Sequence, residues 1–259
     1  MKKLSILMTA AVTGVSMMVV ATTAFADKPE AESYESLCGV ISYVDFVTAA
    51  QTAYTETNQF GFGLPMWATL MDHTGKVCHV YSVKGGGSPV DNGGDDAGNN
   101  AWLGSRVISA QKANTANAFS LDGLAISTGA ISVAVYPGGS LYGLQHSNPV
   151  DTEIAYEGSA ERYGTDGDPM EGERVGGVNV FGGGLALYDG GGVKVGAVGA
   201  SGDTSCRDHT FAWRLRMALG LDNTPNSDAL TLVAVPANLF EQPLCGVSDP
   251  DDIAYGAVQ

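Results

Sequence analysis

The residues best suited to chemistry are the four histidines and four cysteines of this 259-residue chain. Cys206 and His209 form a C-x-x-H pair at the expected start of a helix, where the helix dipole lowers the pKa of a thiol. Cys206 could therefore be a redox-active nucleophile, or could join Cys78 and His79 in a zinc site of two cysteines and two histidines. Adjacent Cys78 and His79 point to opposite faces of a strand, which makes that zinc site hard to build. A disulfide at Cys206 is favoured over both, given the export signal described next.

The N-terminal residues predict an exported protein. Lys2 and Lys3 precede an apolar stretch at 4–20, and Ala24-Phe25-Ala26 has the small-residue pattern of a signal-peptide cleavage site. The alternative is an uncleaved membrane anchor, because the apolar stretch is nearly long enough to span a bilayer. We expect residues 1–26 to be a cleaved signal peptide, and the mature protein to be periplasmic or secreted and outside the membrane.

Export to an oxidising compartment makes disulfides the default for the four cysteines, and three pairings are possible. We favour Cys38–Cys245, because both residues lie in Leu-Cys-Gly contexts near the two ends of the mature chain. The second bond would then be Cys78–Cys206, which would connect a strand to the start of the last helix.

The strongly acidic composition favours a small ligand or a cationic partner over nucleic acid, and the alternative is that the charge serves solubility alone. The full chain has 13 basic and 28 acidic side chains, a net charge of −15. Removing residues 1–26 takes away two lysines and no acids, so 11 basic against 28 acidic side chains leave a net charge of −17. Such a chain repels phosphate backbones and anionic membrane surfaces. The sequence also lacks hydrolase signatures such as G-x-S-x-G and H-E-x-x-H, and it lacks a Walker loop.

The stretch from 174 to 209 is expected to organise the fold. Its apolar runs are separated by glycine-rich turns, as in tightly turned antiparallel strands; the runs are Val178–Phe181, Leu185–Tyr188 and Val193–Val198. A helix then begins at Ser205, which would cap it together with Asp208, and the helix ends at Gly220.

Earlier in the chain, hydrophobic periodicity predicts further elements: a helix at 43–54, strands at 66–71 and 77–83, and a helix at 102–119 capped by Asn99 or Asn100. Simple alternation along the second strand would put Val77, His79 and Tyr81 on one face, and Cys78, Val80 and Ser82 on the other. Residues 128–135 are weakly helical or extended in pattern, and Pro137–Ser140 is expected to be a turn.

The length suits one domain at 27–259 with a core at about 40–220. Residues 151–173 are acidic and aperiodic, which predicts a loop or an insertion on the domain surface. Residues 221–259 are expected to form a C-terminal extension with a possible strand at 230–235.

Three blocks of sequence resemble a known family. The segment VGAVGASGDTSCRDHTFA, from Val195 to Ala212, is similar to the pattern VGAxGxSGxxxxxDxxxA of the haem-binding, so-called haem-degrading family (HbpS/GlcG-like). The blocks SRVISAQKANTANAFS at 105–120 and PGGSLYGLQHSN at 137–148 also match. Together the matches cover about 65–219, in the order found in the family.

The resemblance implies an α+β fold of the profilin-like type, with a five-stranded antiparallel sheet packed with helices, and a homo-oligomer. It also implies haem as the cofactor. His146 lies in the loop whose family counterpart helps to hold haem, and Ser147 aligns with a hydroxyl residue implicated there. Imidazole is a common ligand of haem iron, so His146 is the expected metal ligand. The absence of a C-x-x-C-H motif excludes covalent c-type attachment.

Two further residues are candidates for contact with haem. In the family, the helix that carries Lys112 lies beside the ligand groove, so Lys112 could meet a carboxylate or propionate; the alternative is a solvent-facing lysine with its stem on Phe119. His209, Trp213 and Arg216 share one face of the last helix. That face could bind a flat anionic ligand or form an oligomer contact.

These observations support three hypotheses. The first is an exported haem-binding protein that sequesters or senses haem. The second is an enzyme, either haem-degrading or using Cys206 in thiol redox chemistry. The third is a non-catalytic accessory subunit of an oligomer. We expect a binding protein rather than an enzyme.

Overall fold

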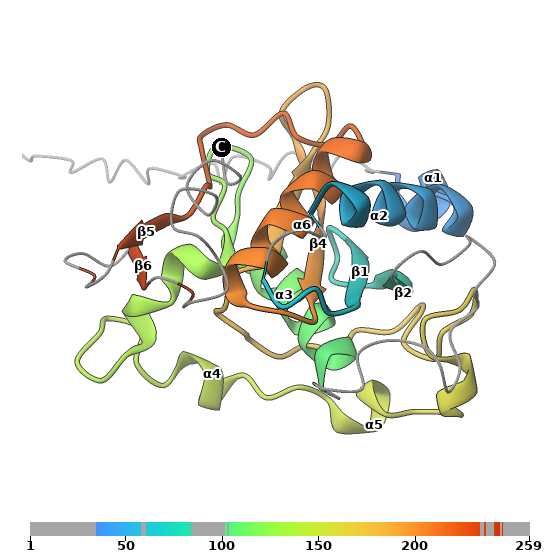
Figure 1. The fold of residues 1–259 in the computed structure, drawn as a ribbon, viewed down its shortest axis with the longest axis horizontal. Coiled ribbons are helices and arrows are strands. Elements are labelled where there is room, and N and C mark those ends of the chain that lie inside the picture. The colour runs from blue at the N-terminus through green and yellow to red at the C-terminus, as the bar shows by residue number, and fades with distance from the viewer. Residues whose placement is uncertain are drawn as a thin grey trace, which may run out of the picture. The chain divides into compact units, whose positions relative to one another are not determined.

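A four-stranded antiparallel sheet in the order β2-β1-β4-β3 lies between two layers of helices (Figure 1). The computed structural model describes residues 35–57, 61–83, 102, 104–233, 236, 241–243 and 245. The strands of the sheet are β1 (Met66–Asp72), β2 (Val77–Val83), β3 (Gly184–Tyr188) and β4 (Lys194–Ser201). The central strands β1 and β4 are far apart in the sequence and pair from Trp67–Ser201 to Asp72–Gly196.

One face of the sheet is covered by α1 (Leu37–Val40), α2 (Tyr43–Thr57) and α6 (Ser205–Ala218). In Figure 1, α2 and α6 lie side by side in this layer. Phe46 from α2 and Phe211 from α6 are fully buried in the core that this layer forms with the sheet. Burying aromatic side chains is among the largest favourable contributions to such a core.

The other face is covered by α3 (Ser105–Phe119), which lies along β1 and β4. A Cβ atom at Gly199 would lie 1.9 Å from the carbonyl oxygen of Ser109, so glycine is what permits this close helix–sheet approach. Because both faces are covered, every residue of β1, β2 and β3 is buried. Among the described residues, no helix combines the length and the hydrophobicity needed to cross a membrane.

Short elements connect α3 to β3 and follow α6. They are the 3-10 turns η2 (Thr128–Ile131), η3 (Val133–Val135) and η4 (Ala160–Arg162), the one-turn helices α4 (Leu144–Ser147) and α5 (Thr152–Ala155), and the parallel pair β5 (Thr231–Val233) and β6 (Glu241–Pro243). The structure confirms the helices predicted at 43–54 and 102–119, the hairpin at 66–83, and the strand predicted at 230–235. The predicted signal peptide and the caps at Asn99 or Asn100 lie outside the described residues.

The predicted five-stranded sheet is wrong, because the described part of the chain has four strands in the main sheet. The missing strand is Val178–Phe181. Its backbone bonds to side chains rather than to a neighbouring strand: the amide of Asn179 donates to Thr115 Oγ1 at 2.9 Å, and the amide of Phe181 donates to Asn179 Oδ1 at 3.2 Å. The α+β class with an antiparallel sheet is confirmed.

The predicted alternation along β2 is also wrong at Cys78. Leu70 pairs with His79 and Met71 pairs with Val77, so Cys78 is an extra residue in a bulge. The bulge places Val77 and Val80 in the same core cluster, beneath α3, and Cys78 in the cluster on the α2 side.

The acidic segment 151–173 is more ordered than a surface loop. The carboxylate of Asp168 is buried and accepts from Arg106 Nε at 2.9 Å, while Arg106 Nη1 donates to Ala155 O at 2.8 Å. Met170 is fully buried in the core beneath α3. Sequence periodicity could not predict this packing, because the contacts are made by single residues of a turn-rich segment.

The start of α3 and the cap of α6 differ from prediction, while α6 begins at Ser205 as expected. The helix α3 begins at Ser105 rather than at Trp102, whose carbonyl accepts from the Ser105 amide at 3.1 Å. The cap of α6 is Thr204 rather than Ser205, because Thr204 Oγ1 accepts from the Arg207 amide at 3.2 Å. The predicted end is confirmed at Gly220, which has φ +66°.

Candidate functional site

The two disulfides are Cys38–Cys78 and Cys206–Cys245, so the predicted pairing is wrong although all four cysteines are bonded. The packing of α1 on the hairpin brings the Cα atoms of Cys38 and Cys78 to 4.6 Å, a proximity that the shared Leu-Cys-Gly contexts do not indicate. Cys206 therefore carries no thiol in this structure, and the zinc site is not formed.

The Cys206–Cys245 bond lies at the edge of two adjoining hollows beside the N-terminus of α6. The first hollow has a volume of about 400 Å³ and the second about 420 Å³. Both are lined by Phe181, Ser205 and Cys245, so they adjoin, and we call the two hollows together the groove. Sites for small molecules are concave and of this size, so the groove is the candidate functional site.

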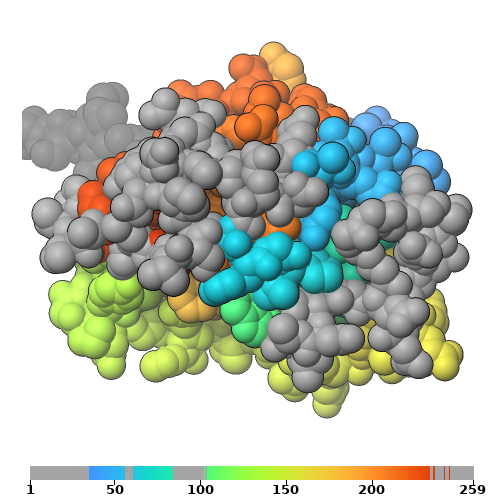
Figure 2. All heavy atoms as spheres, in the orientation of Figure 1, coloured from blue at the N-terminus to red at the C-terminus, as the bar shows by residue number. Residues whose placement is uncertain are grey.

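Three exposed aromatic side chains surround the second hollow. Phe62, Trp102 and Phe181 have exposed fractions of 58%, 43% and 55%. The rings of Phe62 and Trp102 meet edge to face with centroids 5.9 Å apart. The segment 61–65, drawn in cyan, reaches the surface on the face shown in Figure 2. Large apolar groups gathered at the mouth of a groove are typical of a binding site.

Asp203 holds the segment that presents Phe62. Its carboxylate accepts from the amides of Phe62 and Leu64, each at 2.9 Å, and it forms an ion pair with Arg207. Gly61 has φ +63°, and a Cβ atom there would lie 2.4 Å from Asp203 Oδ1. The turn at Gly61 thus depends on glycine, and the aromatic rim depends on that turn.

A buried ion pair forms the floor of the second hollow. Lys112 Nζ lies 2.7 Å from Asp208 Oδ2 and 3.0 Å from Ala200 O, which accept its hydrogen bonds. Burial lowers the pKa of Lys112, against the attraction of Asp208. Burial raises the pKa of Asp208 to about 6, although Lys112 opposes the shift. The alternative of a solvent-facing Lys112 is wrong, since the side chain is buried and its charge is balanced within the fold.

The wall of the first hollow contains buried polar atoms without partners. Ser132 and Gln242 are 6% and 4% exposed, and neither Ser132 Oγ nor Gln242 Oε1 has a hydrogen-bond partner among the described residues. Val135, Pro137 and Val180 supply apolar surface around them. Leaving a buried polar atom unpaired costs free energy, so polar atoms left unpaired in a hollow indicate a place for a ligand's polar group.

The predicted histidine and serine ligands lie outside the groove lining. His146 is exposed on α4, next to Gln145, which does line the first hollow. Ser147 is exposed as well, and its hydroxyl donates locally to Leu144 O at 3.1 Å. Of the four predicted cofactor contacts, Lys112 alone lines the groove described here.

His209 and Arg216 of the predicted face are inside the protein and Trp213 is half-buried, so an open surface for a ligand or an oligomer contact formed by these three residues is wrong. His209 is fully buried, and burial lowers the pKa of its imidazole to about 3. Arg216 is also buried and donates to both carboxylate oxygens of Asp228 at 2.7 and 2.8 Å. Among the described residues, no group of three or more metal-ligating side chains could hold a metal ion.

Sequence patterns missed most of the groove. Phe62, Tyr136 and Gln242 stand in segments without clear periodicity, and packing of distant segments brings them together. Phe181 carried a usable signal, since an aromatic residue followed by three glycines is a poor candidate for a buried strand end.

Comparison with known proteins gives a family match across the groove. Residues 96–215 match the family described as haem degrading protein HbpS-like, which confirms the predicted resemblance. Among curated proteins, none matches this chain.

Several solved structures are similar at low identity. A crystal structure of a PduOC–heme complex is 21% identical, with 70% of this chain and 93% of that chain covered and a TM-score of 0.43. The protein ORFY of Klebsiella pneumoniae, assigned to family DUF336, is 22% identical, with coverage of 70% and 90% and a TM-score of 0.42. A double mutant of Streptomyces reticuli HbpS is 13% identical, with coverage of 82% and 99% and a TM-score of 0.40.

Proposed function

Because residues 96–215 match the HbpS-like family, we propose that this protein binds haem without a covalent bond in the groove. The observation that carries the proposal is the position of the match. It contains nearly the whole groove lining, with Phe62, Gln242 and Cys245 as the lining residues outside it. The proposed role is that of an exported protein that sequesters or senses haem.

The residues of the groove fit haem, which is flat, largely apolar and carries two propionates. The rings of Phe62, Trp102 and Phe181 would contact the macrocycle, and such contacts are favourable for a flat aromatic ligand. Ser132 Oγ and Gln242 Oε1 have no hydrogen-bond partner among the described residues, so they could form hydrogen bonds with polar groups of a ligand in the first hollow. When bound, haem supplies an iron centre that can take small ligands or exchange electrons.

Lys112 supports this site from below. Its ammonium group is already paired with Asp208, so it would hold the groove floor in place rather than bind a propionate as a free cation. His146 and Ser147 directly follow Gln145, which lines the first hollow, and the sequence resemblance would place the contact with iron at these two residues.

A binding role is favoured over thiol chemistry because Cys206 is bonded to Cys245. Export is proposed from the signal-peptide pattern, and mass spectrometry of the protein from its native host should then find an N-terminus at Asp27. An N-terminus at Met1 would refute cleavage. We also propose that the protein forms a homo-oligomer.

Haem titration of the purified full chain tests the proposal. A saturable shift of the Soret band is expected, and Trp102→Ala or Phe181→Ala should weaken the affinity about tenfold through lost ring contacts. Tyr156→Ala is the matched control, because Tyr156 is 60% exposed and does not line the groove. Absence of a saturable shift in the wild type would refute haem binding. Bleaching of the band with a reductant in air would support the degrading alternative instead.

A further inference from the structure

We propose that Tyr136 is the protein ligand of the haem iron, an inference that rests on the proposed haem-binding function. Tyr136 lines the first hollow, together with the unpaired Ser132 Oγ and Gln242 Oε1.

The choice of donors in the groove is narrow. Proteins bind haem iron through histidine, cysteine thiolate, methionine or tyrosine. Among the described residues lining the groove, Tyr136 and Cys245 are of these types. Cys245 is bonded to Cys206 and offers no thiolate. The phenol of Tyr136 is therefore the available donor.

None of the four histidines lines the groove. His73 lies in the turn between β1 and β2, and His79 Nε2 is 2.8 Å from Ile41 O on the α2 side of the sheet. His209 is fully buried behind the groove. His146 is exposed on α4. His146 is the nearest competitor in sequence, because its neighbour Gln145 lines the first hollow.

The backbone holds Tyr136 in place, while its hydroxyl forms no hydrogen bond with a described residue. The amide of Tyr136 donates to Val133 O at 3.1 Å, and its carbonyl accepts from Gly139 at 2.8 Å. A Cβ atom at Gly139 would lie 2.1 Å from Ala134 O, so this turn requires glycine at that position. The side chain of Tyr136 is 46% exposed, and its hydroxyl makes no hydrogen bond with a described residue. A fixed backbone with an unengaged oxygen is what a preformed ligand position requires.

Binding of the Tyr136 phenol to ferric iron requires no added oxidant, reductant or other reactant. To bind ferric iron, the phenol would release its proton to solvent and its oxygen would donate an electron pair, with no electron transferred. The phenolate charge would offset the positive charge of the ferric centre. Haem binding should therefore release a proton and should weaken as the pH falls.

Resonance Raman and EPR spectra of the ferric complex of the full chain test the assignment. The wild type should show iron–phenolate vibrations in a high-spin complex. Tyr136→Phe should remove these vibrations and weaken haem binding about tenfold, as expected for the loss of one coordinate bond. Tyr142→Phe is the matched control, because Tyr142 is 63% exposed and does not line the groove, so it should behave as the wild type. His146→Ala should also keep the phenolate signature.

The outcomes separate this inference from the proposed function. Haem bound to the wild type without iron–phenolate vibrations would overturn the role of Tyr136 and leave haem binding intact. Persistence of the vibrations in Tyr136→Phe would overturn the assignment as well. If the wild type binds no haem, both proposals fail. Tyr136→His supplies a second variant, expected to restore tight binding with an imidazole spectrum, so a folding defect in Tyr136→Phe would still leave a decisive measurement.

Discussion

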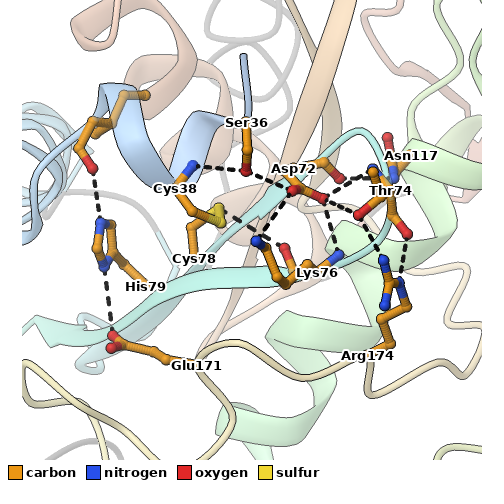
Figure 3. Close-up of a disulfide and its surroundings, with 11 residues drawn as sticks. Ser36, Cys38, Asp72, Thr74, Lys76, Cys78, His79, Asn117, Glu171 and Arg174 are labelled. Atoms are coloured by element: carbon orange, nitrogen blue, oxygen red, sulfur yellow. Dashed lines mark hydrogen bonds and ion pairs between the residues drawn. A yellow bond between two sulfur atoms is a disulfide. The ribbon is translucent and has the colours of Figure 1, made fainter. Parts of the chain in front are cut away.

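The two disulfides lie in corners of opposite character. The first corner, around Cys38–Cys78, contains a carboxylate, Asp72, whose oxygens are paired within the protein (Figure 3). There Asp72 accepts from Ser36 Oγ at 2.6 Å, and from the amides of Thr74 and Lys76 at 2.9 and 3.1 Å. Burial by itself raises the pKa of Asp72, but these hydrogen bonds hold the carboxylate charged and bring its pKa below the usual value.

The second corner, around Cys206–Cys245, is open and its polar groups are incompletely paired. Ser132 Oγ and Gln242 Oε1 are buried without partners, and Phe181 is more than half exposed beside them. In the first corner, the two buried atoms without a hydrogen bond, His79 Nδ1 and Glu171 Oε1, face each other at 3.5 Å, whereas the residues that carry the unpaired atoms of the second corner line a hollow. Since native proteins pair nearly all of their buried polar atoms, this difference distinguishes a structural cluster from a binding site. The presence of a disulfide does not distinguish them.

The largest expected effect comes from removing one disulfide at a time. The Cys38→Ala/Cys78→Ala variant should lose about 2–4 kcal/mol of unfolding free energy, the usual cost of removing a native disulfide. It should keep its haem affinity per folded molecule, because neither Cys38 nor Cys78 lines the groove. Urea unfolding and haem titration measure the two quantities.

The second disulfide provides the matched variant, because the two bonds span nearly equal separations of 40 and 39 residues. The loss of chain-entropy stabilisation should therefore be similar for the two variants. A difference between their unfolding free energies would arise from the folded state. In Cys206→Ala/Cys245→Ala the segment that carries Gln242 can detach without unfolding the main sheet. We expect a smaller loss of stability and about a tenfold loss of haem affinity. Equal losses of stability with unchanged affinity would contradict the comparison.

A pH-dependent contact sharpens the description of the first corner. His79 Nε2 is 2.8 Å from Ile41 O, and Nδ1 is 3.5 Å from Glu171 Oε1. Burial lowers the pKa of His79, but Glu171 and the Ile41 carbonyl outweigh burial and raise it above the usual value; Asp166 adds to the rise. The protonated form is thus favoured by folding. Its contribution to stability is complete below pH 6.5 and is lost as the pH rises through the pKa of the folded state.

The His79→Gln variant removes this titration. Urea unfolding between pH 5.5 and pH 8.5, a range of about three units around the usual histidine value, should show a decline for the wild type and a flatter profile for the variant. The expected change is smaller than that from either disulfide, because one contact is affected. His146→Gln, at an exposed position on α4, is the control and should keep the wild-type profile. A variant profile as steep as the wild-type profile would exclude His79 as the source.

Local patterns predicted the elements whose signals are local. The helix α2, the hairpin and the glycine that ends α6 follow from periodicity and turn chemistry, and each lies where expected. The prediction of a strand at Val178–Phe181 was wrong. The amide of Asn179, which would have bonded to a neighbouring strand, donates instead to the side chain of Thr115, far away in the sequence. The bulge at Cys78 is similarly invisible, since it depends on pairing with β1.

The candidate site was less predictable than the fold. The resemblance predicted Lys112 beside a ligand groove, and Lys112 lines the second hollow, but its pairing with Asp208 depends on the packing of α3 against the start of α6. Tyr136 stands before a Pro-Gly-Gly turn and carries no sequence signal of binding. Its importance comes from the neighbours that the fold brings to it, Ser132 from the preceding turn and Gln242 from β6.

The smallest expected effect concerns one hydroxyl group, and it separates the two kinds of buried serine. Ser109 Oγ donates to Arg106 O at 2.7 Å and lies 2.7 Å from Thr69 Oγ1, whereas Ser132 Oγ has no partner among the described residues. Ser109→Ala leaves the Thr69 hydroxyl unpaired and should cost about 1–2 kcal/mol of unfolding free energy. Ser132→Ala removes an oxygen that was already unpaired, so the unfolding free energy of this variant should change by less than about 0.5 kcal/mol.

Haem titration should show the reverse order, with about a threefold loss of affinity for Ser132→Ala and none for Ser109→Ala. If Ser132→Ala destabilised the protein as much as Ser109→Ala, Ser132 would have a partner inside the protein, and the first hollow would lose one of the two polar atoms that indicate a ligand.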